Sequence, residues 1–177
     1  MRNGVVSLEP ANKDNVQLLM NWKLDPIAQG LYKKVPNMTP DELEDLFLQS
    51  PDRWYFLIKS AIDHRPLGRF YYRAWRFQED PRQIDWELNL LIAEPRERGK
   101  GYGTAVQMLA SGILLRLPET HTVFAYTFFN NLGERRALEK AGFEYAGYLP
   151  SEYYRVASPP EEWVLYIRRK TGVYIDQ

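Results

Sequence analysis

The stretch Arg96–Val106, "RERGKGYGTAV", places three glycines and three cations between Pro95 and a helical pattern. Glycine adopts positive φ angles at little cost and lets a ligand approach the backbone without a Cβ in the way. The first N–H groups of a helix have no partner inside the helix, and the helix dipole adds positive charge at that end. The stretch therefore predicts an anion site at a strand-to-helix junction.

Other phosphate-binding loops fit this stretch less well. A dinucleotide fingerprint needs G-x-G-x-x-G after the first strand of a βαβ unit, whereas this run is G-x-G-x-G after several strands. A Walker loop needs Gly-Lys-Ser/Thr, and the sequence here is Gly-Lys-Gly. A flexible basic turn without a ligand stays as the alternative, although glycines next to a helix cost roughly 1 kcal/mol each relative to alanine.

The pattern of apolar residues around this loop predicts a mixed α/β domain with the order β-α-α-β-β-β-α-β-α-β-β. We expect about seven mostly antiparallel strands, about four helices on both faces, and a single domain over residues 1–177. Thr39 and Pro40 form a helix start, and Gly142 ends a later helix. Strands are expected at 5–8, 54–60, 67–77, 83–93, 122–128, 143–149 and 162–169, and helices at 13–25, 41–50, 103–117 and 131–142.

The composition excludes several classes of protein. Lys+Arg and Asp+Glu are 23 each, so no net charge favours nucleic acid or an anionic membrane as a partner. There is no cysteine, and the two histidines lie far apart in the sequence, so we expect no metal site and no disulfides. No long apolar run or leader-like start is present, which predicts a cytoplasmic protein.

Taken with the element order, the glycine loop resembles that of the GNAT N-acetyltransferase superfamily, Q/R-x-x-G-x-G/A after the fourth strand. Arg98 to Gly103 matches this pattern position for position. Residues 130–143, "NNLGERRALEKAGF", resemble the N-x-x-S-x-x-x-L-E-K-x-G-F signature of the branch that acetylates ribosomal-protein N-termini. The resemblance covers the whole chain. It implies a GNAT fold and an acetyl-CoA-dependent N-acetyltransferase that acts on a primary amine, either a peptide N-terminus or a small molecule.

The resemblance also implies a set of residues that bind acetyl-CoA. The backbone of the loop would hold the pyrophosphate, the end of the fourth strand would pair with the pantetheine amides where the fourth and fifth strands separate, and Asn131 would contact the pantetheine arm. The full set is Leu91, Ile92, Ala93, Arg96, Arg98, Gly99, Lys100, Gly101, Tyr102, Gly103, Thr104, Asn131 and Arg135. No metal is implied, and the resemblance allows a homodimer.

A catalytic base is expected on the fourth strand, "IDWELNLLIA". Alternation places Asp85, Glu87 and Asn89 on one face and apolar residues on the other. In the GNAT order this polar face would line the acceptor channel, so Glu87 is the preferred base and Asp85 the second choice. A polar face that is exposed, or paired with Arg69 or Arg73, is the alternative. One family pattern would place the acid at position 88, which is Leu88 here unless the strand is bulged.

The sequence departs from the family pattern at the general acid. The signature serine is Glu134 here, and the tyrosine that protonates the leaving thiolate in many relatives is Leu138. Tyr145, Tyr148 or solvent could take that part. These departures keep a second function open, a GNAT-like module that binds acyl-CoA without turnover. The acceptor is not indicated, although Glu152, Glu161 and Glu162 lie in a segment that flanks the acceptor side in this fold.

Overall fold

The computed structural model describes the chain except residues 2–3, 33–36, 77–79, 81, 149–162 and 171–177. A seven-stranded sheet with the order β1-β2-β3-β4-β5-β7-β6 forms the centre. Every neighbouring pair is antiparallel except β4 and β5. The strands are β1 Val6–Pro10, β2 Arg53–Ser60, β3 Pro66–Trp75, β4 Ile84–Ile92, β5 Thr120–Phe128, β6 Glu144–Tyr148 and β7 Trp163–Arg169.

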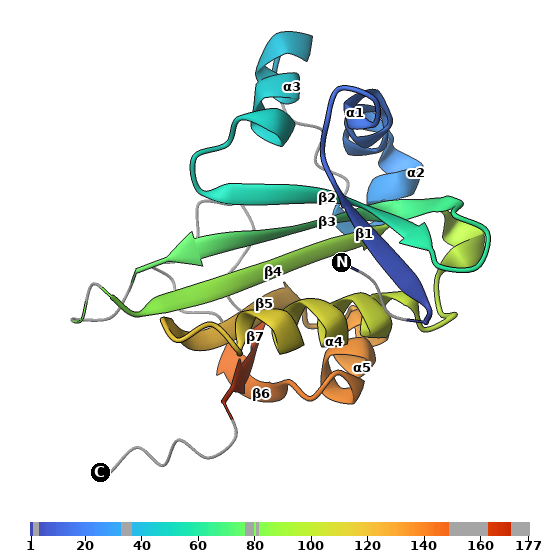
Figure 1. The fold of residues 1–177 in the computed structure, drawn as a ribbon. Coiled ribbons are helices and arrows are strands. Elements are labelled where there is room, and N and C mark those ends of the chain that lie inside the picture. The colour runs from blue at the N-terminus through green and yellow to red at the C-terminus, as the bar shows by residue number, and fades with distance from the viewer. Residues whose placement is uncertain (2–3, 33–36, 77–79, 81, 149–162, 171–177) are drawn as a thin grey trace, which may run out of the picture.

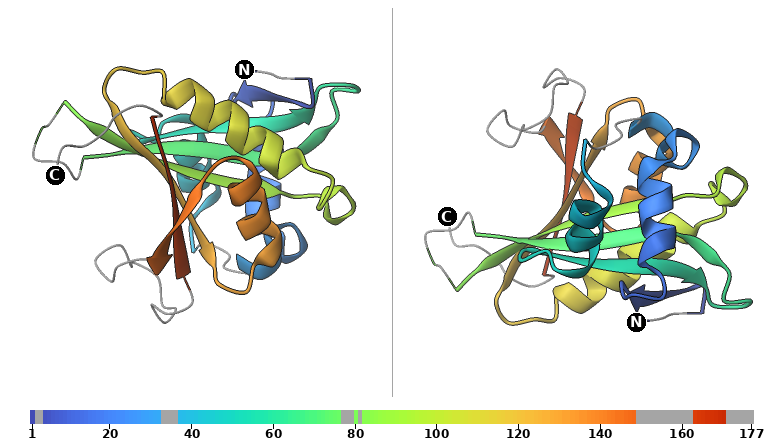
Figure 2. Two further views of the ribbon diagram at one scale, coloured as in Figure 1. Left: turned by 90° about the horizontal axis from the view of Figure 1, so that it is seen from below. Right: turned by 90° about the horizontal axis from the view of Figure 1, so that it is seen from above.

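Helices cover both faces of the sheet, with α1, α2 and α3 on one side and α4 and α5 on the other (Figures 1 and 2). The helices are α1 Val16–Leu24, α2 Pro26–Gln29, α3 Pro40–Leu48, α4 Tyr102–Leu114 and α5 Leu132–Lys140, with 3-10 turns η1 Gly30–Tyr32 and η2 Pro95–Glu97. The predicted mixed α/β fold is therefore confirmed, with one short helix more than expected. The predicted strand ends at Phe77, Leu149 and Glu162 fall outside the described residues.

Local signals explain where the helices begin and end. Thr39 accepts a hydrogen bond from the Glu42 backbone N–H, and the Glu42 side chain accepts one from the Thr39 N–H, so α3 starts with a capping box. Asp25 ends α1 and caps α2, because its side chain accepts from the Ile27 N–H. Gly142 follows α5 at φ 85°, the left-handed conformation that closes a helix.

Two hydrophobic clusters lie on opposite faces of the sheet. Leu88, Phe70 and Val106 belong to the cluster under α4 and α5. Leu57, Leu19 and Leu43 belong to the cluster under α1 and α3. Since successive side chains of a strand point to opposite faces, Glu87 projects into the second cluster while Trp86 and Leu88 project into the first.

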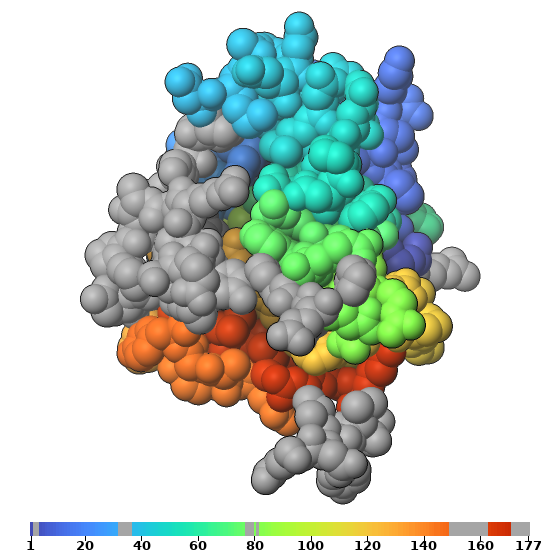
Figure 3. Space-filling model, turned by 90° about the vertical axis from the view of Figure 1, so that its left-hand side faces the viewer, coloured from blue at the N-terminus to red at the C-terminus, as the bar shows by residue number. Residues whose placement is uncertain are grey.

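The parallel pair β4–β5 opens partway along its length. The two strands pair from Ile84 with Thr120 to Glu87 with Phe124, and the register extends no further in the described chain. From Leu88 onward β4 stays paired with β3 alone, so one edge of its backbone faces an opening. Figure 3 shows the opposite side of the molecule, where the end of β3 and the start of β4 lie between α3 and β7. The glycine loop follows β4 at the far end of this opening.

Candidate active site

The glycine loop leads from η2 into the N-terminus of α4. Gly99 has φ 77° and Gly101, the residue before the helix, has φ 88°, which an L side chain rarely adopts. A Cβ built on either residue would meet nothing within 4 Å, so both face open space. No side chain caps α4 and no acidic residue lies in its first turn. The amides at this end therefore have no side-chain cap, which is the arrangement of a helix N-terminus that can accept an anion.

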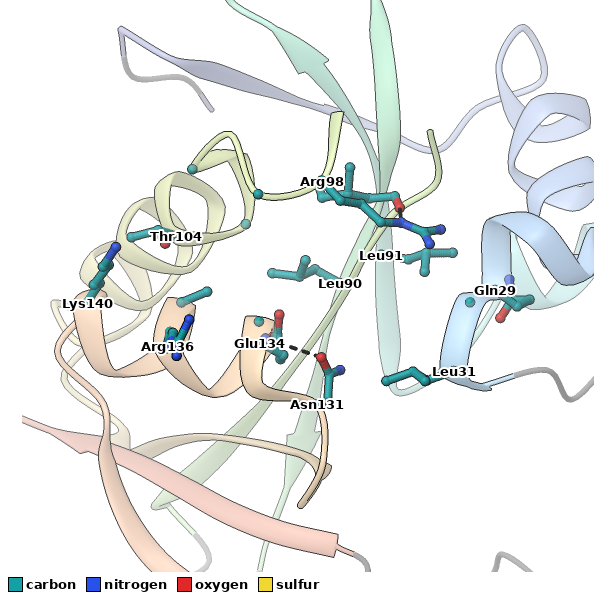
Figure 4. Close-up of a pocket in the computed structure, with 17 residues that line it drawn as sticks. Gln29, Leu31, Leu90, Leu91, Arg98, Thr104, Asn131, Glu134, Arg136 and Lys140 are labelled. Carbon is teal, nitrogen blue, oxygen red and sulfur yellow. Dashed lines mark hydrogen bonds between the residues drawn. The ribbon is translucent and has the colours of Figure 1, made fainter. Parts of the chain in front are cut away.

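A pocket of about 520 Å³ lies against this helix end. Its walls come from the loop, the end of β4, one side of α5, and the α2–η1 segment on the far side (Figure 4). Eight residues expected to bind the cofactor line it: Leu91, Ile92, Arg98, Gly99, Gly101, Gly103, Thr104 and Asn131. Nine further lining residues were not predicted: Gln29, Gly30, Leu31, Leu90, Gly133, Glu134, Arg136, Ala137 and Lys140.

The Arg98 side chain also has a structural role, because it donates hydrogen bonds to backbone carbonyls of two segments. Its Nε donates to the Ile92 carbonyl at 2.9 Å, and its Nη2 donates to the Ala28 carbonyl at 2.8 Å and the Ile27 carbonyl at 3.0 Å. The guanidinium thus joins α2 to the end of β4. This connection explains why residues 29–31, distant in the sequence, form one wall of the pocket.

The N–H and C=O groups of successive β4 residues point to opposite edges of the strand. This alternation corrects part of the prediction that Leu91 to Ala93 pair with the pantetheine amides. The Ala93 N–H donates to the Leu67 carbonyl at 2.9 Å, and a Cβ on Gly68 would lie 1.9 Å from the Leu91 oxygen, so both residues direct their polar groups toward β3. The backbone groups of Leu90 and Ile92 point to the other edge, and Arg98 occupies the Ile92 carbonyl. Leu90, which was missed, is the residue whose backbone faces the opening.

Four predicted cationic or aromatic residues do not line the pocket. The Lys100 ammonium lies 3.1 Å from Glu97, Tyr102 packs on the core under α4, and Arg96 is exposed. Arg135 donates to the Tyr166 hydroxyl and the Phe129 carbonyl, away from the pocket. Because successive helix residues differ by about 100° in direction, Arg136 and Lys140 face the pocket instead.

Glu87 lies at the centre of a buried cluster of hydrogen-bond donors. Its side chain is 1% exposed and accepts from the Tyr71 hydroxyl at 2.9 Å, the Trp75 indole N–H at 2.8 Å and the Tyr126 hydroxyl at 3.3 Å. Burial and the nearby Glu87 carboxylate raise the pKa of Tyr126 well above its usual range. The alternative of a polar face paired with Arg69 or Arg73 holds for Asn89, which accepts a hydrogen bond from Arg69 at 3.2 Å. It does not hold for Glu87, which forms no ion pair with either arginine in the described chain and is bonded to two hydroxyls and an indole instead.

The other two catalytic candidates occupy different surroundings. Asp85 is buried, and its Oδ1 lies 2.9 Å from His121 Nδ1, in the part of β4 that still pairs with β5. Tyr145 is half exposed on β6, packs edge-on against Tyr166, and does not line the described pocket. Residues Glu152, Glu161 and Glu162 lie outside the described residues.

Glu134 is the acidic side chain of the pocket. It is in the first turn of α5, where Asn131 caps the helix by accepting from the Glu134 N–H at 3.3 Å. Gln107 on α4 donates to Glu134 Oε1 at 2.5 Å. Burial raises the pKa of Glu134 to about 7, while the Gln107 hydrogen bond opposes this shift.

Comparison with known proteins agrees with this geometry. The model of the acetyltransferase (GNAT) domain family matches residues 6–144, so the chain belongs to the GNAT acetyltransferases, enzymes that use acetyl-CoA to acetylate amines. No curated protein matches the sequence. No metal-binding group of His, Cys, Asp or Glu occurs among the described residues, and no helix among them has the length and apolar character to cross a membrane.

Solved structures of the same fold cover nearly the whole chain. The aminoglycoside acetyltransferase AAC(6')-Ib in complex with coenzyme A has 20% identity and a TM-score of 0.72, with 93% of this chain and 95% of that chain covered. Spermidine N-acetyltransferase from Vibrio cholerae, in complex with CoA and spermine, has 16% identity and a TM-score of 0.72, covering 94% and 96%. A domain from Methanocaldococcus jannaschii has 16% identity and a TM-score of 0.70, covering 94% and 99%.

Proposed function

We propose that this chain transfers the acetyl group of acetyl-CoA to a primary amine by direct attack in a ternary complex. The observation that carries the proposal is the pocket that joins the uncapped N-terminus of α4 to the unpaired edge of β4. The amides of Gly101 to Thr104 would bind the pyrophosphate, and Leu90 would pair with the pantetheine arm. Arg136 and Lys140 would contribute positive charge from α5. The open space at Gly99 and Gly101 fits a phosphate group.

Glu87 is our proposed base. An amine attacks a thioester only when it is unprotonated, and at pH 7 roughly 10–20% of a peptide α-amine is neutral, against less than about 0.1% of a lysine-like amine. A proton acceptor therefore accelerates the reaction most for alkyl amines. Because three donors surround Glu87, the proton would reach it through water or through the Tyr126 hydroxyl. Asp85 ranks second, since it lies where β4 and β5 are still paired.

The charge near Glu87 bears on the acceptor. Arg53, Arg69 and Arg73 project from β2 and β3 on the same face of the sheet as Glu87. Arg73 donates to Asp52 at 2.6 Å, whereas Arg69 is 7% exposed, donates to Asn89, and forms no ion pair in the described chain. A buried cation without a carboxylate disfavours a polycation beside it. This favours a peptide N-terminus over polycationic acceptors such as kanamycin, which is bound in a structure of AAC(6')-Ib, and spermine, which is bound in the spermidine N-acetyltransferase.

A peptide acceptor also agrees with the resemblance of residues 130–143 to the branch that acetylates ribosomal-protein N-termini. We further propose a single domain over residues 1–177, because all described strands join one sheet. A cytoplasmic location and a homodimer remain part of the proposal. The second candidate function, an acyl-CoA-binding module without turnover, is favoured by one observation: Leu138 is fully buried and cannot protonate the thiolate.

The test is release of CoA thiol from acetyl-CoA with separate pools of N-terminal peptides, lysine peptides, polyamines, aminoglycosides and amino sugars. We expect turnover with the N-terminal peptides, reduced about 10²–10⁴-fold by Glu87→Gln. Glu144→Gln removes one exposed carboxylate on β6 and serves as the matched control. Acetyl-CoA binding without turnover in any pool would support the binding module. Turnover with polyamines alone would contradict the peptide assignment.

A further inference from the structure

The proton that the leaving CoA thiolate needs has no source in the family signature, because Leu138 replaces its tyrosine. The pocket itself offers one. Its titratable lining residues are Glu134, Arg98, Arg136 and Lys140. Arginine and lysine hold their protons far above neutral pH, so Glu134 is the one side chain among these that can exchange a proton near pH 7.

Glu134 is positioned toward the space that the pantetheine arm would fill. Figure 4 shows the Glu134 side chain at the wall of the pocket, between Leu90 and Asn131. Leu90 carries the free backbone edge of β4, and Gly99 to Thr104 lie at the other end of the pocket. A ligand with its pyrophosphate on α4 and its arm along Leu90 passes Glu134 on the way to the opening between β4 and β5.

The partner of Glu134 indicates which protonation state the fold accommodates. Gln107 is 1% exposed, donates from Nε2 to Glu134 Oε1, and leaves its own Oε1 buried without a hydrogen bond in the described chain. A carboxylate has no hydrogen to donate to the Gln107 Oε1 atom. A protonated carboxyl would donate its O–H to Gln107 Oε1 and complete a two-bond acid–amide pair, which removes the cost of a buried unpaired acceptor.

The charges around Glu134 agree with a neutral carboxyl that can become an anion. The N-terminus of α5 and the cations Arg98, Arg136 and Lys140 in the same pocket favour the carboxylate, whereas burial disfavours it. None of the three cations forms an ion pair with Glu134 in the described chain. Burial raises the pKa of Glu134 to about 7, although the hydrogen bond from Gln107 lowers it. A general acid with a pKa near the working pH is protonated in a large fraction of the molecules and still gives up its proton readily.

We propose that Glu134 is the general acid that protonates the sulfur of coenzyme A. As the tetrahedral intermediate collapses, the C–S bond breaks and its electron pair goes to sulfur. The Glu134 O–H leaves Gln107 Oε1, and its proton forms the S–H bond. The new C–N bond is kept, and the amine proton leaves to the base. Glu134 becomes a carboxylate that Gln107 Nε2 and the α5 N-terminus stabilise, and solvent returns its proton before the next turnover.

The inference rests on the proposed acetyltransfer and is tested with Glu134→Gln, which keeps the size and the amide-facing hydrogen bonds but carries no acidic proton. We expect kcat to fall about 10²–10⁴-fold while KM for acetyl-CoA changes little. We also expect the wild-type decline of kcat above pH 7 to disappear in the variant. Glu144→Gln, the same charge change outside the pocket, should match the wild type in both respects.

The outcomes separate the two proposals. Wild-type turnover with an unchanged rate and pH profile in Glu134→Gln overturns the assignment of Glu134 alone. A rise in KM with kcat and the pH profile unchanged also overturns it, because Glu134 would then contribute to binding only. If the wild type releases no thiol with any amine pool, acetyltransfer itself fails, and the role of Glu134 falls with it.

Discussion

The raised pKa of Glu134 has a consequence for stability that can be measured without substrate. Folding raises the pKa of this carboxyl from 4.5 to about 7, so the folded state binds its proton more tightly than the unfolded state. The stabilisation from the protonated form is complete below about pH 4.5 and is lost as the pH rises to about 7. The shift corresponds to about 3 kcal/mol of unfolding free energy, before any discount for the part of the side chain that water reaches.

Replacing Glu134 with Gln keeps this side chain neutral at every pH. We therefore expect Glu134→Gln to unfold like the wild type near pH 4.5 and to be more stable by up to about 3 kcal/mol above pH 7. Urea unfolding of the ligand-free protein between pH 4.5 and 9 measures this difference. Glu144→Gln controls for the change in net charge. A constant difference between Glu134→Gln and wild type across this range would refute the pKa argument.

Three other perturbations test the loop, its anchor and a helix cap. Gly101→Val should weaken acetyl-CoA binding at least tenfold in calorimetry, since residue 101 has φ 88° and faces open space; Gly112→Ala, an unobstructed site within α4, should bind normally. Arg98→Met removes the hydrogen bonds from the guanidinium to four backbone carbonyls. It should lower the free energy of unfolding in urea by about 2 kcal/mol, and an unchanged urea midpoint would contradict the anchoring role of Arg98. Thr39→Ala should lower the free energy of unfolding by about 1 kcal/mol through loss of the capping box. An unchanged thermal unfolding midpoint would contradict this role of the cap.

Features that depend on neighbouring residues were predictable from the sequence. The glycine loop, the Thr39 helix start and the Gly142 helix end are such features, because each requires a particular backbone conformation from a few consecutive residues. The two faces of β4 were also predictable, since alternation requires only an extended strand. The same alternation did not reveal which backbone edge of β4 would be left unpaired, so Leu90 was missed and Leu91 and Ala93 were assigned in its place.

The rest of the site was decided by the tertiary structure. Arg135 and Arg136 are equally cationic in the sequence, and only the rotation of α5 against α4 directs Arg136 to the pocket. Gln107 and Glu134 come from different helices, so their hydrogen bond and the resulting pKa depend on how the two helices pack.

The sequence by itself determined a glycine-rich strand-to-helix junction, a mixed α/β order and a strand with two acids on one face, because these follow from local backbone geometry and periodicity. Only the tertiary structure decided where β4 and β5 part, which segment closes the pocket beyond Arg98, and which acid is enclosed by hydroxyls and which by an amide. These depend on contacts between residues distant in the chain, and burial from those contacts raises the pKa of Glu134.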